Sequence, residues 1–400
     1  MGRHLGALDG LRGIAAYAVL LAHLLDVLFA FEGAPSISGL SSCLAYLGMS
    51  LFFVLSGFVI FYTYGESIGR ERLATYRFFV ARFARLYPLY AVAIVVSLVE
   101  FPDPRFTPWL VLSYATLTQA WFNVQMTTFP PAWSISAEWF FYLAFIPLVL
   151  PVRRIKRPLL ALAAYCAATL GGVALLFGLF AEQLFSLVGE WLVFDGKVSA
   201  DAVLWTIYFS PPLRLLEFIA GMLAARAYVV LAERRLSAKL AALAMAVSVL
   251  WIAAIIGDGV FTIVNLPLFG AIRSNFLFGP ALAVLMLSVC LSSGKASRFL
   301  ASRPLRFTGD ISYSVYIWQF SMMSLLGPTL RADDWSLQGG MNMVLKAAVV
   351  IGLTTAFAYG SYSVIEVPAR RWLRSVLEPK SSGRKASVAH SPSLRGVGGP

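Results

Sequence analysis

Apolar stretches separated by short polar or charged segments run along almost the whole chain. Many of them approach the ~20 residues that a helix needs to cross a bilayer. The pattern predicts ten membrane-spanning helices, near residues 13–31, 44–64, 86–100, 136–150, 158–180, 213–231, 240–257, 276–292, 311–330 and 343–364. The aromatic segment Trp109–Trp121 is apolar but short, so we expect a re-entrant or interfacial element there rather than an eleventh crossing.

The basic residues alternate with this layout. With the N-terminus placed in the cytoplasm, 26 of the 32 Lys and Arg residues fall at inner helix ends and 6 fall at outer ones. Cytoplasmic loops of membrane proteins carry such an excess of Lys and Arg. An extra crossing at 109–121 would reverse every later loop. The sequence therefore predicts that both termini are cytoplasmic.

The composition supports the same fold class. Hydrophobic residues make up 59% of the chain and charged residues 13%, and the mean hydropathy is +0.76. Typical soluble domains have about 45–50% and about 25%. Soluble enzymes, secreted disulfide scaffolds and disordered proteins are thus excluded. We expect an all-α, polytopic transmembrane helical bundle embedded in a lipid bilayer.

Neither nucleic acid nor metal is expected as a partner. The net charge of +12 lies in short clusters between apolar segments, which is typical of membrane topology rather than of a nucleic-acid groove. Cys43, Cys166 and Cys290 are scattered, and His4 and His390 lie in terminal segments. These residues form neither a disulfide framework nor a metal-ligand cluster.

The chain divides into a membrane domain, residues 1–375, and a polar tail, residues 376–400. The tail is rich in Ser, Gly, Lys and Arg, so we expect it to be disordered, basic and cytoplasmic. The first apolar stretch has no convincing small-residue cleavage site and predicts a retained helix rather than a signal peptide. The outer loop near 181–212 carries four acidic residues and is either an ordinary hydrated loop or a surface that helps to bind a polar acceptor.

Arg12 and His23 mark one stripe of the first span. Eleven residues at about 100° each return to within about 20° of the same face, with an axial rise of about 16 Å. The stripe therefore offers a guanidinium near the cytoplasmic surface and an imidazole near mid-membrane. Ionisable groups in a span are candidates for function by default. A neutral imidazole there can accept a proton, although a structural histidine bonded to a neighbouring helix is the alternative.

Arg82 and Arg85 lie three residues apart and share a helix face at the inner surface. Guanidinium forks suit phosphate, and a phosphorylated cytosolic cofactor would arrive on this side. The alternative is topological anchoring, because any inner loop attracts arginine.

Three intramembrane acids complete the candidates from residue types alone. Glu138 follows Trp133-Ser-Ile-Ser-Ala, which opens the fourth span from the outer side. Glu217 lies one turn from Arg214, and Glu366 ends the last span near the cytoplasm. Each is either a structural ion-pair partner or part of a site, and Glu138 has no basic neighbour in sequence.

Several motifs, in this order along the chain, resemble the integral-membrane acyltransferase-3 family. The resemblance covers about residues 5–375, and the spacing of Arg12 and His23 is its most specific feature. The motifs are Leu8-Asp-Gly-Leu-Arg-Gly13, Arg12-x10-His23, Phe52-Phe-Val-Leu-Ser-Gly-Phe58, Arg82-x-x-Arg85, Trp133-Ser-Ile-Ser-Ala-Glu138, Gly309-Asp-Ile-Ser-Tyr-Ser-Val-Tyr316 and Ile365-Glu-x-Pro-x-Arg-Arg371.

The resemblance implies a membrane O-acyltransferase of the bacterial cytoplasmic (inner) membrane, similar to exopolysaccharide acetyltransferases. Members of this family acylate polysaccharides, lipid-linked sugars, peptidoglycan or small metabolites such as macrolides. They draw the acyl group from cytoplasmic acyl-CoA, most often acetyl-CoA. A saccharide acceptor, and a partnership with polysaccharide biosynthesis or export machinery, follow from the resemblance as expectations.

The sequence departs from the family pattern in two ways. Gln319 stands where a histidine usually falls in the ninth span, which puts any second-histidine role in doubt. Tyr313, in the same motif, still matches, with a buried structural tyrosine as the other reading. Some members carry an extracytoplasmic hydrolase-like domain, and none is expected in this sequence.

The resemblance and the predicted topology combine into one mechanism. Arg12, Arg82 and Arg85 would hold the phosphates of acyl-CoA, and the pantetheine arm would run toward His23. His23 would act as general base on an acceptor hydroxyl, or would take the acyl group itself before passing it on. A glycolipid or polysaccharide transporter or flippase is the rival interpretation, and the absence of repeat symmetry in the sequence disfavours it.

Overall fold

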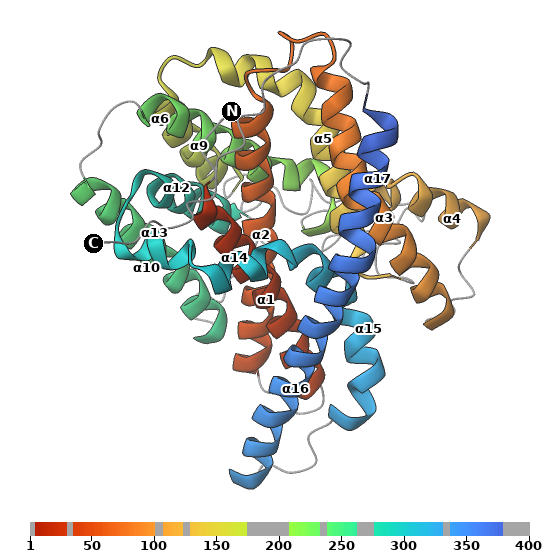
Figure 1. The fold of residues 1–400 in the computed structure, drawn as a ribbon. Coiled ribbons are helices and arrows are strands. Elements are labelled where there is room, and N and C mark those ends of the chain that lie inside the picture. The colour runs from red at the N-terminus through yellow and green to blue at the C-terminus, as the bar shows by residue number, and fades with distance from the viewer. Residues whose placement is uncertain are drawn as a thin grey trace, which may run out of the picture.

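The computed structural model describes residues 5–29, 35–100, 107–122, 129–173, 208–232, 238–261, 276–330 and 337–378, and every regular element within these ranges is helical (Figure 1). The first half contains α1 (Gly6–Phe29), α2 (Pro35–Tyr64), α3 (Ala74–Glu100), α4 (Pro108–Ala115), the short helix η1 (Gln119–Trp121), α5 (Ala132–Arg154), α6 (Pro158–Ala168) and the π-helix η2 (Thr169–Val173). The second half contains α9 (Pro211–Leu231), α10 (Ala238–Phe261), α12 (Phe278–Leu291), α13 (Lys295–Leu300), α14 (Arg303–Asp310), α15 (Ser312–Leu330), α16 (Leu337–Ser361), the π-helix η5 (Tyr362–Glu366) and α17 (Val367–Leu377).

A helix coincides with at least part of each of the ten predicted spans. Among the described residues, six helices are long and apolar enough to cross a membrane: Gly6–Phe29, Ser38–Tyr64, Ala74–Glu100, Ala132–Arg154, Lys239–Phe261 and Val344–Leu377. The apolar helices Pro158–Gly172 and Phe278–Leu291 are shorter. In α9, Arg214, Glu217 and Arg226 interrupt the apolar sequence. The prediction of an all-helical protein with several helices able to cross a membrane is thus confirmed, while ten crossings and two cytoplasmic termini stay predictions.

Helix α3 begins twelve residues before the start that the sequence predicts for the third membrane span. The sequence places this start at residue 86, after the arginines, whereas α3 begins at Ala74. The arginines lie within the helix, in agreement with the helix face that the sequence predicts for Arg82 and Arg85. These two face a cavity inside the protein, whereas Arg77 is exposed. A prediction from hydropathy alone places the end of the membrane span at these charged residues.

The segment 109–121 forms a short element, as expected. Helix α4 has 8 residues, which at 1.5 Å per residue gives a length of about 12 Å, far below the ~30 Å of a bilayer core. Its continuation η1 is held to the start of α5, where the Gln119 side-chain amide donates a hydrogen bond to the Ala132 carbonyl at 2.7 Å. The segment therefore packs against the helix that carries Glu138.

Helix α2 lies at the centre and packs most extensively against α9 and α1. Glycines allow its close approach to α9. A Cβ atom at Gly57 would overlap the Phe218 carbonyl, and one at Gly221 would overlap the Val54 carbonyl. Small residues of this kind let helix backbones approach closely in membranes.

Helix α1 separates two hydrophobic clusters. Ala16, Leu20 and Leu24, which are spaced four residues apart, pack against α15 and α16. Another stripe of the same helix carries Arg12 and His23, which line cavities between α1, α2 and α5. Packing of its apolar stripe thus fixes the rotation of α1 and directs both ionisable residues inward.

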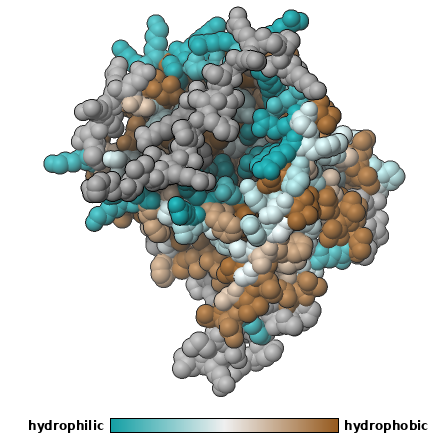
Figure 2. All heavy atoms as spheres, viewed as in Figure 1, coloured by the Kyte–Doolittle hydropathy of each residue, from teal (hydrophilic) through white to brown (hydrophobic). Residues whose placement is uncertain are grey.

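The surface is suited to lipid. Large apolar side chains are exposed on α3, α10 and α16, among them Val99, Leu250 and Val344. Figure 2 shows hydrophilic residues gathered at the upper end of the molecule and hydrophobic residues over its lower part. The bundle is therefore membrane-embedded. Most of the predicted loop 181–212 and the tail from residue 379 lie outside the described residues.

Candidate active site

Two neighbouring cavities lie beside α1. The larger, of about 380 Å³, we name the arginine cavity because Arg12, Arg82 and Arg85 line it. The smaller, of about 170 Å³, we name the histidine cavity because His23 lines it. Arg12 and His23 therefore lie on one helix, as predicted, but in different cavities.

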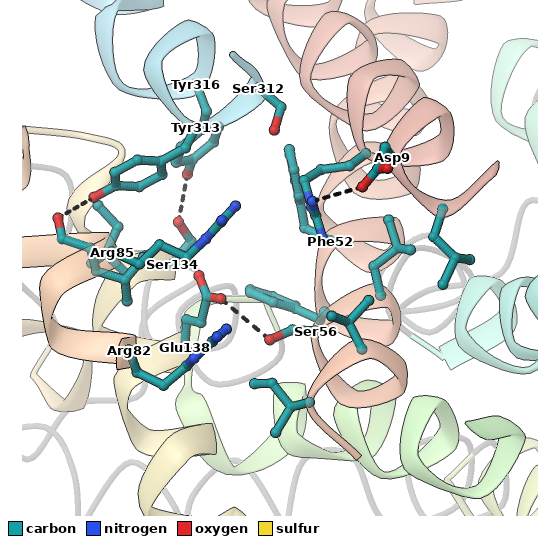
Figure 3. Close-up of a pocket in the computed structure, with 18 of the residues that line it drawn as sticks. Asp9, Phe52, Ser56, Arg82, Arg85, Ser134, Glu138, Ser312, Tyr313 and Tyr316 are labelled. Carbon is teal, nitrogen blue, oxygen red and sulfur yellow. Dashed lines mark hydrogen bonds and ion pairs between the residues drawn. The ribbon is translucent and has the colours of Figure 1, made fainter. Parts of the chain in front are cut away.

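The arginine cavity draws its polar side chains from five helices (Figure 3). Besides the three arginines, its lining includes Asp9 of α1, Ser56 of α2, Ser134 and Glu138 of α5, and Ser312, Tyr313 and Tyr316 of α15. Three guanidinium groups face two carboxylates there, so the cavity keeps an excess of positive charge.

Arg82 is held by aromatic residues. Its Nη2 donates to the Tyr64 hydroxyl at 3.3 Å, and its guanidinium carbon lies 5.3 Å from the Tyr64 ring centroid and 5.9 Å from that of Tyr142. Within the part of the chain that the structure describes, its Nε has no hydrogen-bond partner. The Arg82 side chain is thus held in position by its aromatic neighbours, and its Nε–H group remains available to a ligand.

Arg12 and Arg85 are each balanced by an acid. Arg12 Nη1 lies 3.5 Å from Asp9 Oδ1, one turn earlier on α1. Arg85 interacts electrostatically with Glu366, which the π-helix η5 presents from the other end of the chain. Glu366 is buried, accepts a hydrogen bond from Ser314 at 3.0 Å, and lies 3.9 Å from Arg370. Glu366 therefore places a negative charge near Arg85, just outside the lining of the cavity.

Glu138 lies among the arginines rather than beside His23. Its Oε1 accepts hydrogen bonds from Tyr142 at 2.6 Å and from Ser56 at 3.3 Å, and the carboxylate interacts electrostatically with Arg12 and Arg82. Glu138 thus faces into the bundle toward α3 and lines the arginine cavity. Its part in a site, which the sequence left open, stays a prediction.

Tyr313 closes the arginine cavity on the side of α15. Its hydroxyl donates to the Leu86 carbonyl at 2.7 Å, next to Arg85 in the chain. The same helix contributes Tyr316, whose hydroxyl lies 2.7 Å from Ser134 Oγ. Tyr313 therefore joins α15 to α3 and also lines the cavity.

His23 lines the histidine cavity together with Asp26 and Ser41. The imidazole lies 4.5 Å, centroid to centroid, from the ring of Phe320, and in the described part of the chain its Nδ1 is without a hydrogen-bond partner. Asp26, one turn later on α1, interacts electrostatically with His23 and accepts a hydrogen bond from Ser41. An imidazole beside a carboxylate is suited to accept a proton, because the carboxylate stabilises the imidazolium that forms.

Gln319, the departure from the family pattern, is buried beside His23. Its side-chain nitrogen donates to the Tyr316 carbonyl at 3.1 Å. The amide thus occupies the side of the imidazole that faces α15.

Glu217 belongs to neither cavity. Its carboxylate lies 3.1 Å from Arg214 Nη1, with the two side chains 3% and 1% exposed. The guanidinium is surrounded by the rings of Tyr208, Phe53 and Trp133. The pair is a buried ion pair that joins the start of α9 to its neighbours, which is the structural alternative that the sequence left open.

Several site residues were missed from the sequence. Asp26 shares a helix face with His23, so its spacing was a usable signal. Ser56, Ser134 and Tyr316 lie within motifs of the resemblance, but no pattern distinguished them there. Met49, which lines both cavities, carries no chemical signal in sequence.

The sequence of this chain is similar to those of known proteins. The family model described as an acyltransferase domain matches residues 5–363. This chain belongs to the acyltransferase-3 family. It is 29% identical over 247 residues to "Acyltransferase MdmB" of Streptomyces mycarofaciens, which covers 55% of this chain and 57% of that protein. It is 25% identical over 399 residues to "Peptidoglycan O-acetyltransferase OatA" of Listeria monocytogenes, which covers 92% of this chain and 56% of that protein.

A shorter match, 37% identical over 94 residues, links the chain to "Protein 2 in picA locus" of Rhizobium radiobacter, over 24% of this chain and 44% of that protein. The chain spans about half the length of the curated relatives that it matches. No solved structure matches it. The assignment of the chain to its family therefore comes from sequence similarity alone.

Proposed function

We propose that this acyltransferase-3 family member is a membrane O-acyltransferase that moves an acyl group, in the first place acetyl, from cytoplasmic acyl-CoA to a hydroxyl group. The acceptor is a cell-surface or exported polysaccharide or a lipid-linked saccharide. The observation that carries the proposal is that α1 presents Arg12 to a cavity with two further arginines and His23 to a neighbouring cavity with a carboxylate.

The arginine cavity fits the donor. Its volume of about 380 Å³ lies within the range of about 300–1,000 Å³ that is common for small-molecule sites. Arg82 keeps an unused buried donor in the described structure, and guanidinium groups bind phosphate by paired hydrogen bonds. Arg12, Arg82 and Arg85 would hold the phosphates of acyl-CoA, with Glu138 and Glu366 limiting their mutual repulsion.

The histidine cavity fits the transfer step. His23 takes the proton of the acceptor hydroxyl, and Asp26 stabilises the resulting imidazolium. The acceptor oxygen forms a bond to the acyl carbonyl carbon while the bond from that carbon to the CoA sulfur breaks. The proton then passes from His23 to the thiolate, so His23 ends neutral. Trapping of labelled acyl-His23 in the absence of acceptor would instead show transfer through an acyl-enzyme.

This function requires access from both sides of a membrane. We infer a multi-pass protein of the bacterial cytoplasmic membrane with both termini cytoplasmic, so that donor and acceptor arrive from opposite sides. The relative from Listeria is named a peptidoglycan O-acetyltransferase, which supports a saccharide acceptor. Polysaccharide biosynthesis or export machinery would supply such an acceptor.

The test uses labelled acetyl-CoA and membranes that contain the wild type or His23→Ala, incubated with the host's glycan and lipid-linked saccharide fractions. We expect base-labile label in the saccharide with the wild type and none with His23→Ala at equal protein level. Retained transfer by His23→Ala would remove the assigned role of His23. Label that enters a small metabolite instead of saccharide would reassign the acceptor, and no release of CoA with any donor or acceptor would contradict the proposed function.

A further inference from the structure

Among the described residues, two side chains are shared by the linings of the arginine cavity and the histidine cavity, and we name them the wall between the cavities. Met49 of α2 and Tyr316 of α15 each line both cavities. Both are nearly buried, with 3% and 7% of their surface exposed. Under the proposed function, an acyl group that arrives in the first cavity must reach His23 in the second, so it must meet this wall.

Tyr316 is the fixed half of the wall. Its hydroxyl lies 2.7 Å from Ser134 Oγ and 3.3 Å from the Pro131 carbonyl oxygen. Its ring makes an edge-to-face contact with Phe52 at 6.0 Å between centroids. Hydrogen bonds at the tip and packing along the ring hold this side chain in place.

Met49 is the half that can move. A methionine side chain is unbranched, has three rotatable bonds and fills irregular gaps. Its backbone, in contrast, is fixed by the preceding residue, because a Cβ atom at Gly48 would lie 2.7 Å from the Ala15 carbonyl oxygen of α1. The Met49 side chain beyond Cβ is therefore the part of this residue that can adjust to a bound group.

We propose that Met49 is a specificity-determining residue that limits the length of the transferred acyl group. The reacting carbonyl carbon must lie where the acceptor oxygen and His23 meet, so the rest of the acyl chain occupies space along the wall. A short acyl group fits beside the Met49 thioether, and each additional methylene group collides with it. This inference rests on the proposed function and adds the residue that selects the acyl chain.

The experiment compares transfer from acetyl-CoA and from butyryl-CoA to the host's saccharide fraction by membranes with the full chain. Met49→Ala removes the thioether and its methyl group. We expect the ratio of butyryl to acetyl transfer rates to rise about tenfold or more, because one methylene group in a pocket is worth about 10- to 200-fold in rate. Met286→Ala is the matched control. Met286 is fully buried on α12, and it does not belong to the described lining of either cavity.

The outcomes separate the two proposals. An unchanged ratio in Met49→Ala, with normal acetyl transfer, overturns the role of Met49 and leaves the proposed function intact. An equal rise in Met286→Ala also overturns it, because general loosening then explains the effect. Absence of transfer by the wild type from either donor contradicts the proposed function itself. If Met49→Ala lowers the amount of folded protein, the smaller change Met49→Val is measured in the same way, with a smaller rise expected.

Discussion

Replacement of Arg82 by glutamine tests the donor side of the site. The change removes the charge, the hydrogen bond to Tyr64 at 3.3 Å, and the guanidinium that lies over the rings of Tyr64 and Tyr142. A hydrogen bond to a charged group contributes about 1.5–3 kcal/mol. Since about 1.4 kcal/mol changes an affinity tenfold, loss of one phosphate contact predicts a rise of about 10- to 150-fold in the KM for acyl-CoA.

The assay measures acyl transfer against acyl-CoA concentration at saturating acceptor. We expect the effect in KM with a smaller change in kcat, because Arg82 lines the arginine cavity while His23 lines the other. Arg77→Gln is the matched control: it lies on the same helix and is exposed. Arg82→Lys keeps the charge but loses the planar fork, so it should fall between the wild type and Arg82→Gln.

Two results would refute this reasoning. If Arg82→Gln leaves the KM for acyl-CoA unchanged, Arg82 serves only to anchor the helix. If Arg77→Gln raises the KM equally, the effect comes from the general positive charge of the surface rather than from the cavity.

Three further predictions concern two of the acids and the helix packing. Glu138→Gln should lower kcat/KM for acyl-CoA at least tenfold at an unchanged level of folded protein. The amide oxygen still accepts from Tyr142 and Ser56, but the charge that faces Arg12 and Arg82 is lost. Steady-state kinetics with size-exclusion profiles check this prediction, and loss of folded protein would make Glu138 structural. Glu217→Gln should destabilise the protein by about 3–5 kcal/mol, because it leaves the buried Arg214 charge unpaired; an unchanged unfolding midpoint in detergent would contradict this. Gly221→Leu should abolish folded protein, because the side chain would force α9 away from the Val54 carbonyl. Gly257→Leu is the control and should be tolerated, since nothing lies within 4 Å of a Cβ atom there. Equal yields of folded protein for the two variants would contradict the close packing of α9 against α2.

The helices could be predicted well because their signal is local. A run of apolar residues long enough for a bilayer forms a helix whatever its neighbours are, since no water is present to satisfy the backbone groups. The boundaries were less certain where charge and helix coincide. Hydropathy places the start of the third span at residue 86, after the arginines, whereas α3 begins at Ala74. Tertiary structure provides the internal cavity that Arg82 and Arg85 face.

The acidic residues show the opposite case. Glu138, Glu217 and Glu366 are each a single carboxylate within or at the end of a span, and the sequence left each as either an ion-pair partner or part of a site. The structure distinguishes them by the direction each helix faces: Glu138 toward the arginine cavity, Glu217 toward Arg214, and Glu366 toward Ser314 beside Arg85. Such differences depend on how neighbouring helices rotate and pack.

The sequence by itself determined the helical membrane class, the family, and the stripe of α1 that carries Arg12 and His23, because each depends on composition or on spacing along one helix. The tertiary structure alone decided that this stripe is divided between two cavities, with Met49 and Tyr316 between them. The physical reason is that a cavity is formed by side chains from several helices. Their mutual positions come from packing between residues far apart in the chain, such as Gly57 and Gly221, and no local pattern encodes them.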